Sequence, residues 1–184
     1  MQKNKSYKII FTGPESSGKT TLAMLAANHY STHWLPEYAR TYLEQIDYPY
    51  QIADLLKIAE GQVSSEQQFI KKNRNQDFLF FDTSLLVIKV WSIFKYGFYN
   101  HKIDQLLKQN LPDIYFLCDW QIPWEYDPLR EAPNDREALF DLYHQELLEL
   151  DIHFHILKGT PTERLAQIRT QLELIYISTK KTDI

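Results

Sequence analysis

The residues with the clearest chemistry lie in the stretch GPESSGKTT, where two of the five glycines of the chain occur. Four residues separate Gly13 from Gly18, and Lys19 and Thr20 follow directly, which is the full spacing of a phosphate-binding loop. Glycines let successive N–H groups turn toward one oxyanion, a lysine adds positive charge, and a threonine hydroxyl can bind Mg²⁺. The motif predicts a nucleoside triphosphate site with Mg²⁺, formed by Gly13, Pro14, Glu15, Ser16, Ser17, Gly18, Lys19, Thr20 and Thr21.

The residues on either side of this loop have the patterns that the motif requires. Residues 7–12 (YKIIFT) form a short β-branched and aromatic run, and residues 20–30 carry Leu22, Leu25 and Ala26 at helical spacing. A chance match in an unrelated loop would lack this order of strand, loop and helix. The start of a helix also adds its own positive end to an anion site.

Further strand-like runs alternate with helical patterns along the chain. They lie at residues 32–36, 78–82, 113–118 and 152–157. This alternation predicts an α/β fold with a parallel sheet that helices cover on both faces, and ligands in such sheets bind at the carboxyl ends of the strands. No linker divides the 184 residues, so we expect one domain over 1–184 with a core at about 7–177.

Two helix starts are indicated by a capping residue with an acid three positions later. Asn134 with Glu137 has this spacing, and so has Thr160 with Glu163, where Pro161 adds a second signal. Apolar stripes follow at Leu139, Leu142, Tyr143 and Leu147, and at Leu165, Ile168, Leu172 and Ile175.

Acids follow two of the predicted strands. Asp82 ends FLFFD, where a P-loop protein holds Mg²⁺ directly or through water; a cap on the next helix is the alternative. Glu37, in PEYAR, is the candidate general base for an acceptor hydroxyl, with Arg40 as an anion contact or as the partner of Glu37. A surface pair of Glu37 with Arg40 is the alternative interpretation.

The fourth run leads into an irregular segment rich in proline and tryptophan, residues 119–136, which we call the lid segment. Segments of this length often close over active sites. Arg130 and Arg136 are predicted to neutralise charge on a transferring phosphoryl group. The same segment contains five acids, so pairing of these arginines in a solvated loop is the alternative.

Composition bounds the function classes. A net charge of −4 argues against a broad electrostatic grip on nucleic acid. The chain starts without an apolar signal region, and its longest apolar stretch, residues 78–94, is broken by Asp82 and Lys89. Cys118 is the single cysteine, which excludes an internal disulfide. We expect a cytoplasmic protein without a membrane span or a nucleic-acid partner.

Several motifs together resemble one family. GPESSGKTTLA, PEYAR, FFDTSLLVIKVW with KYG, and IPWEYDPLRE with REALF are similar to the nicotinamide riboside kinase domain of bacterial NadR-type proteins, over roughly residues 7–170. The resemblance implies a three-layer P-loop nucleoside kinase fold with strand order 2-3-1-4-5, and ATP-dependent phosphorylation of the 5′-hydroxyl of nicotinamide riboside to the mononucleotide. The family's His-x-Gly-His nucleotidyltransferase signature is absent, so we expect the reaction to stop there.

The resemblance assigns roles by position. It makes Lys19, Asp82, Arg130 and Arg136 catalytic, and it supports Glu37 less directly. Thr20 and Asp82 are the expected Mg²⁺ ligands. Because nicotinamide riboside carries a flat cationic ring, aromatic faces and acids should bind it. The residues that we expect to bind the substrate are Glu37, Arg40, Tyr42, Asp119 and Trp124. Of these, Trp124 is expected to contact the ring and Asp119 the ribose hydroxyls.

Three other functions also use a phosphate-binding loop. A regulatory GTPase would need Asp-x-x-Gly after the third strand and Asn-Lys-x-Asp for guanine, and both are absent. A kinase for another nucleoside or small hydroxyl acceptor, and a module that senses ATP or NAD without turnover, stay open.

Overall fold

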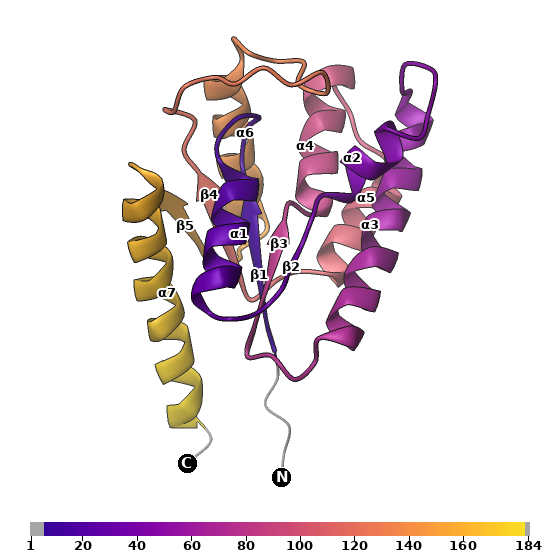
Figure 1. Ribbon diagram of the computed structural model, residues 1–184. Helices are drawn as coiled ribbons and strands as arrows, with labels where there is room; N and C mark the ends of the chain where they lie inside the picture. The colour runs from indigo at the N-terminus through magenta and orange to yellow at the C-terminus, as the bar shows by residue number, and fades with distance from the viewer. Residues whose placement is uncertain (1–5, 183–184) are drawn as a thin grey trace.

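A computed structural model describes residues 6–182 of the chain, with the side chains of residues 6–177 (Figure 1). The strands are β1 (Tyr7–Thr12), β2 (Trp34–Leu35), β3 (Phe78–Asp82), β4 (Ile114–Cys118) and β5 (Phe154–Leu157). The helices are α1 (Lys19–His29), α2 (Tyr38–Leu43), α3 (Ile52–Lys72), α4 (Leu85–Tyr96), α5 (His101–Gln109), α6 (Arg136–Glu149) and α7 (Pro161–Thr182). Each predicted strand is present, although three of them are shorter than expected.

The five strands form one sheet in the order β2-β3-β1-β4-β5, and every pairing is parallel. The predicted fold class and strand order are therefore confirmed. β2 is short because only Trp34 and Leu35 pair with β3, and Pro36 has no N–H to continue the ladder.

Helices cover both faces of the sheet, because side chains along each strand alternate between the faces (Figure 1). Ile9, Phe11, Phe80 and Phe116 pack with α1 and α7 on one face. The opposite face packs with α3, α4, α5 and α6. The result is three layers with two apolar cores, and no described helix is long and apolar enough to cross a membrane.

Of the two predicted helix starts, one is confirmed and one is wrong. Thr160 and Glu163 form the reciprocal cap, since the Thr160 N–H donates to Glu163 Oε2 at 2.7 Å and the Glu163 N–H donates to Thr160 Oγ1 at 3.3 Å. The helix expected after Asn134 begins at Arg136 instead, with Asp135 at the N-cap and no side-chain cap bond. Asn134 lies one residue too early to serve.

The carboxyl ends of the strands meet beneath the lid segment, which crosses the top of Figure 1 between β4 and α6. The predicted apolar stripes lie on the inner faces of α6 and α7, as Leu139, Tyr143, Leu147, Ile168 and Leu172 are buried. The lid segment is therefore anchored to the core by β4 at one end and by α6 at the other.

Candidate functional site

The predicted phosphate-binding loop connects β1 to α1. Gly13 and Gly18 have φ of 130° and 84°, which L-residues rarely adopt, and a Cβ on Gly13 would lie 2.7 Å from the carbonyl oxygen of Cys118. Gly18 is also the N-cap of α1, so the first N–H groups of that helix have no intrahelical partner. The loop thus offers free amide donors at the positive end of a helix, which is an anion site.

Lys19 lies across the mouth of this loop. Its ammonium donates to the carbonyl oxygens of Gly13 at 3.0 Å and Pro14 at 2.6 Å. The hydroxyl of Ser17 is buried without a hydrogen-bond partner among the described residues. A phosphate group would give both side chains a ligand.

Asp82 and Thr20 form the second part of the site. The Thr20 hydroxyl donates to Asp82 Oδ2 at 2.6 Å, and Asp82 is 4% exposed. Asp82 Oδ1 is buried with no partner among the described residues, although such oxygens are rarely left unpaired. A carboxylate oxygen beside a hydroxyl oxygen is the donor set that Mg²⁺ prefers, so these residues fit the ion.

The alternative role for Asp82, as a cap on the next helix, belongs to Ser84. Ser84 is the N-cap of α4, and its hydroxyl accepts from the Leu86 N–H at 3.2 Å. Thr83, between them, has a positive φ of 71°. Asp82 is therefore free for ligand chemistry.

Glu37 occupies the N-cap position of α2, and its side chain makes no cap hydrogen bond. The side chain lines the cavity instead. Burial, and then the nearby charge of Asp82, raise the pKa of Glu37 to about 7, while Lys19 and Arg40 act in the opposite direction. A carboxylate whose pKa lies near neutrality is suited to accept a proton from a hydroxyl.

Arg40 pairs with the lid segment and not with Glu37. Its Nη2 lies 2.8 Å from Asp127 Oδ2, and this pair is partly exposed. The surface pair between Glu37 and Arg40 is therefore absent. Arg40 instead links α2 to the lid segment at the rim of the cavity.

The lid segment is held to the phosphate-binding loop by loop side chains. The carboxylate of Glu15 accepts from the backbone N–H groups of Glu131 and Ala132 at 2.9 and 3.0 Å. The hydroxyl of Ser16 accepts from the N–H of Glu125 at 2.9 Å. Two residues that the motif leaves variable thus connect the loop to the lid segment.

Arg130 and Arg136 form no ion pair with the acids of the lid segment among the described residues. Arg130 donates to the carbonyl oxygen of Glu125, and Arg136 donates to those of Ser16 and Ile122. Both guanidinium groups lie 5.7 Å from the Trp124 ring centroid. The positive charges of Arg130 and Arg136 are therefore not neutralised by ion pairs with these acids.

These residues surround one cavity of about 760 Å³. Its polar part contains the loop, Glu37, Asp82, Arg130 and Arg164. Another part of the wall is apolar and aromatic, and it is formed by Leu43, Tyr50, Leu55, Ile58, Val87, Ile88, Trp91 and Tyr143. We call this part the apolar chamber.

Three predicted substrate residues do not line the cavity. The Tyr42 hydroxyl donates to Asp54 at 2.9 Å, Asp119 accepts from the Gln121 N–H, and Trp124 lies against the two lid arginines. Arg136 and Pro14 also lie outside the lining, although both contact loop residues. The cavity offers Tyr50 and Trp91 as aromatic faces instead.

Arg164, which no sequence motif indicated, is 3% exposed and belongs to the cavity wall. It donates to the carbonyl oxygens of Gly159, Ser17 and Asp119 at 2.9, 2.8 and 3.2 Å. It thereby joins the loop after β5 to the phosphate-binding loop and to the end of β4. The available signal was its place four residues before Ile168 on the apolar stripe of α7, where a charged residue is unexpected.

A parallel sheet in this order, with a glycine loop after its first strand, defines the P-loop kinase class of α/β folds. A family model described as an AAA domain matches residues 8–164. The chain belongs to this AAA domain family. No curated protein sequence matches it.

Solved structures with this fold include three kinds of protein. A NadR protein in complex with NR has a TM-score of 0.74 and 22% identity, covering 91% of this chain and 49% of its own. A thymidylate kinase from Candida albicans has a TM-score of 0.73 and 16% identity, covering 94% and 93%. A deoxyadenosine kinase from M. mycoides with bound dATP has a TM-score of 0.63 and 18% identity, covering 91% and 99%. The chain spans about half the length of the NadR structure.

Proposed function

We propose that this protein is a nucleoside kinase that transfers the γ-phosphoryl group of ATP to the 5′-hydroxyl of nicotinamide riboside. One observation carries the proposal: a phosphate-binding loop, a buried Asp82 with an oxygen that has no partner among the described residues, and Glu37 line a single cavity with an apolar chamber. A module that only senses a nucleotide would not need a carboxylate with a raised pKa facing that chamber.

In this proposal the loop amides and Lys19 bind the triphosphate, and Thr20 and Asp82 would hold Mg²⁺. When bound, the ion would supply positive charge that offsets the negative charge of the triphosphate. Glu37 accepts the proton of the 5′-hydroxyl while the hydroxyl oxygen bonds to the γ-phosphorus, and ADP leaves. Arg130, in the cavity wall, is the arginine that faces the transferring group, and Arg136 holds the loop and the lid segment together.

The apolar chamber is the proposed site for the acceptor. Lys95 lies over Tyr50 at 4.0 Å from the ring centroid and covers one of its faces, whereas no cation of the described side chains lies over Trp91. We therefore assign Trp91 as the contact for the cationic ring, where a cation–π interaction contributes about 0.5–2 kcal/mol. Trp124 is less suitable because two arginines already approach it. The NadR structure with bound NR supports this choice of acceptor.

The proposal is tested by incubating the pure chain with Mg²⁺-ATP and nicotinamide riboside. We expect ADP and nicotinamide mononucleotide in equal amounts, and turnover lowered on the order of tenfold in Trp91→Leu, through KM. Parallel reactions with thymidine, deoxyadenosine and thymidylate examine the other acceptors that kinases of this fold suggest. Turnover with one of these acceptors and not with nicotinamide riboside would replace nicotinamide riboside as the proposed substrate. If no acceptor led to the release of ADP, the kinase assignment would be wrong.

A further inference from the structure

The helix that carries Glu37 has an unusual beginning. An N-cap side chain commonly accepts from the first-turn N–H groups of its helix, but the carboxylate of Glu37 does not. The N–H of Tyr38, the first residue of α2, donates instead to the side-chain oxygen of Gln62 in α3 at 3.2 Å. Gln62 thus fixes the first residue of α2, directly after Glu37, while the Glu37 carboxylate makes no cap and lines the cavity.

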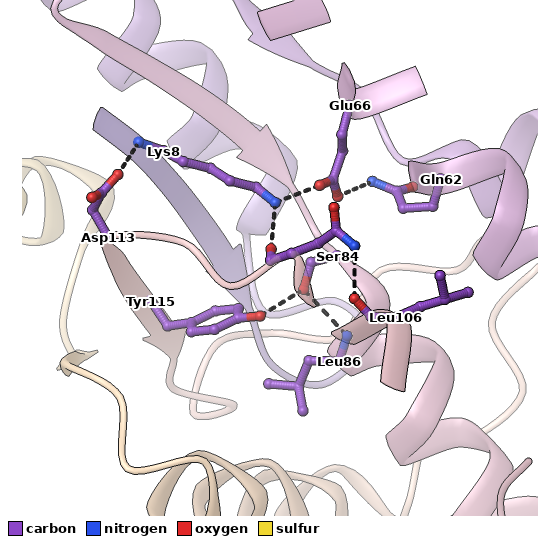
Figure 2. Close-up of polar contacts among 9 residues, drawn as sticks. Lys8, Gln62, Glu66, Ser84, Leu86, Leu106, Asp113 and Tyr115 are labelled. Atoms are coloured by element: carbon purple, nitrogen blue, oxygen red, sulfur yellow. Dashed lines mark hydrogen bonds and ion pairs between the residues drawn. The ribbon is translucent and has the colours of Figure 1, made fainter. Parts of the chain in front are cut away.

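Gln62 is itself fixed by a buried chain of polar contacts (Figure 2). Its Nε2 donates to Glu66 Oε1 at 2.9 Å, and Glu66 Oε2 accepts from Lys8 Nζ at 2.5 Å. Lys8 Nζ also donates to the carbonyl oxygen of Asn110 at 2.7 Å. Gln62 and Glu66 are each 2% exposed, so this chain runs through the interior.

This chain ends on the strand that leads into the phosphate-binding loop. Lys8 is the second residue of β1, and β1 continues through Thr12 to Gly13. One continuous set of contacts therefore joins the start of α2 to the strand that positions the triphosphate site. A buried network with each bond made holds its members in a single arrangement.

The residue before Gln62 makes a second contact with α2. A Cβ on Gly61 would lie 2.1 Å from Cε1 and 2.3 Å from Cζ of the Tyr38 ring, far closer than real Cβ contacts. Glycine inside a helix costs about 1 kcal/mol relative to alanine. At position 61 the missing side chain leaves the space that the Tyr38 ring occupies. The Tyr38 ring lies directly against the backbone of α3 there.

We propose that Gly61 and Gln62 are positioning residues for the phosphoryl acceptor step. Gly61 seats the Tyr38 ring and Gln62 holds the Tyr38 N–H, and together with Glu66 and Lys8 they set Glu37 relative to the phosphate-binding loop. The inference rests on the proposed function, since its effect is on the group that deprotonates the acceptor. Neither residue lines the cavity.

The test compares Gly61→Ala, Gln62→Met and the exposed control Gln67→Ala in the full chain. A displacement of Glu37 by about 1 Å can cost on the order of 10²-fold in rate. We expect this loss in kcat for the first two variants, with the Kd for Mg²⁺-ATP within about twofold of wild type, and no change in the control. The new methyl group of Gly61→Ala must displace the Tyr38 ring, so circular dichroism first confirms that each variant is folded under the assay conditions.

A double variant separates positioning from general damage. Tyr38→Leu removes the ring that the new methyl meets, so we expect Gly61→Ala to cause little further loss of kcat in a Tyr38→Leu background, which is strong coupling between the two sites. Unchanged kcat in both Gly61→Ala and Gln62→Met, equal losses in kcat and ATP affinity, or additive losses in the double variant would each overturn the positioning role. A wild-type chain without turnover would overturn the proposed function instead, and the inference with it.

Discussion

Glu37 and Asp82 place two carboxyl groups in one cavity, and burial raises the pKa of both. Asp82 receives a hydrogen bond from Thr20, whereas Glu37 faces the apolar chamber with a pKa of about 7. A base must be deprotonated to act, so its active fraction rises with pH and is lost as pH falls through that pKa. The two carboxyl groups are therefore suited to different tasks.

This difference predicts a pH profile. kcat/KM should rise with pH to a plateau, with a midpoint at about 7, and fall about tenfold per pH unit below it. Glu37→Gln should lower kcat by roughly 10²–10⁴-fold and remove this limb, because an amide cannot take the proton. The exposed Glu44→Gln, at the opposite end of the same helix, is the matched control. A Glu37→Gln profile with the limb intact would assign the titration to another group.

Single residues also show where sequence reasoning stops. Lys19, Thr20, Glu37 and Asp82 could be found because each lies directly after a predicted strand or in a motif with fixed spacing. The sequence could not show whether Trp124 or Trp91 lines the cavity. Periodicity indicates which face of an element is apolar, but not which other element packs against that face. The cavity wall is made by contacts between segments, and those become visible only in the fold.

At the scale of elements, α4, α5 and α6 meet around one buried cation. Lys89 Nζ lies 2.9 Å from Asp104 Oδ1 and 2.7 Å from Glu146 Oε2, and its side chain is 5% exposed. Lys108 pairs with the other oxygen of Asp104 at 2.7 Å. In the sequence Lys89 served only to interrupt an apolar run, whereas in the structure it joins α4 to α5 and α6.

Removing that cation should destabilise the three-helix contact. Lys89→Met leaves Asp104 and Glu146 buried without their shared partner, which typically costs about 3–5 kcal/mol. Lys102→Met is the control, because its pair with Glu60 is on the surface and is expected to contribute less than about 1 kcal/mol. Urea unfolding measures both free energies. A Lys89→Met chain as stable as the control variant would mean that the cluster contributes nothing net.

Element boundaries were predictable to the extent that local chemistry sets them. The cap at Thr160 and Glu163 was found because both partners are three residues apart, and the strands 7–12 and 78–82 were found by their β-branched and aromatic runs. The start expected at Asn134 was wrong because the lid segment continues to Asp135. That boundary depends on contacts with the phosphate-binding loop, more than one hundred residues earlier.

At the scale of the whole molecule, the nucleotide site joins segments from the entire chain. The phosphate-binding loop contacts the end of β4 through Gly13, the lid segment through Glu15, and α7 through Arg164. A ligand that binds this loop therefore binds only the folded chain. Its binding free energy should appear as stability of the whole domain.

Mg²⁺ and ATP should consequently raise the melting temperature together. A ligand at one hundred times its Kd adds about 2.7 kcal/mol, which corresponds to roughly 5–10 °C for a chain of this size. EDTA should remove most of this shift, because the loop amides and Lys19 then bind the triphosphate without the ion that Thr20 and Asp82 would hold. For Asp82→Asn, the rise in melting temperature with ATP should be small both with and without EDTA. For the control Asp127→Asn, in the lid segment, this rise should depend on Mg²⁺ as it does in wild type. Equal Mg²⁺ dependence in wild type and Asp82→Asn would place the ion elsewhere, and the unpartnered oxygen of Asp82 would then need a different ligand.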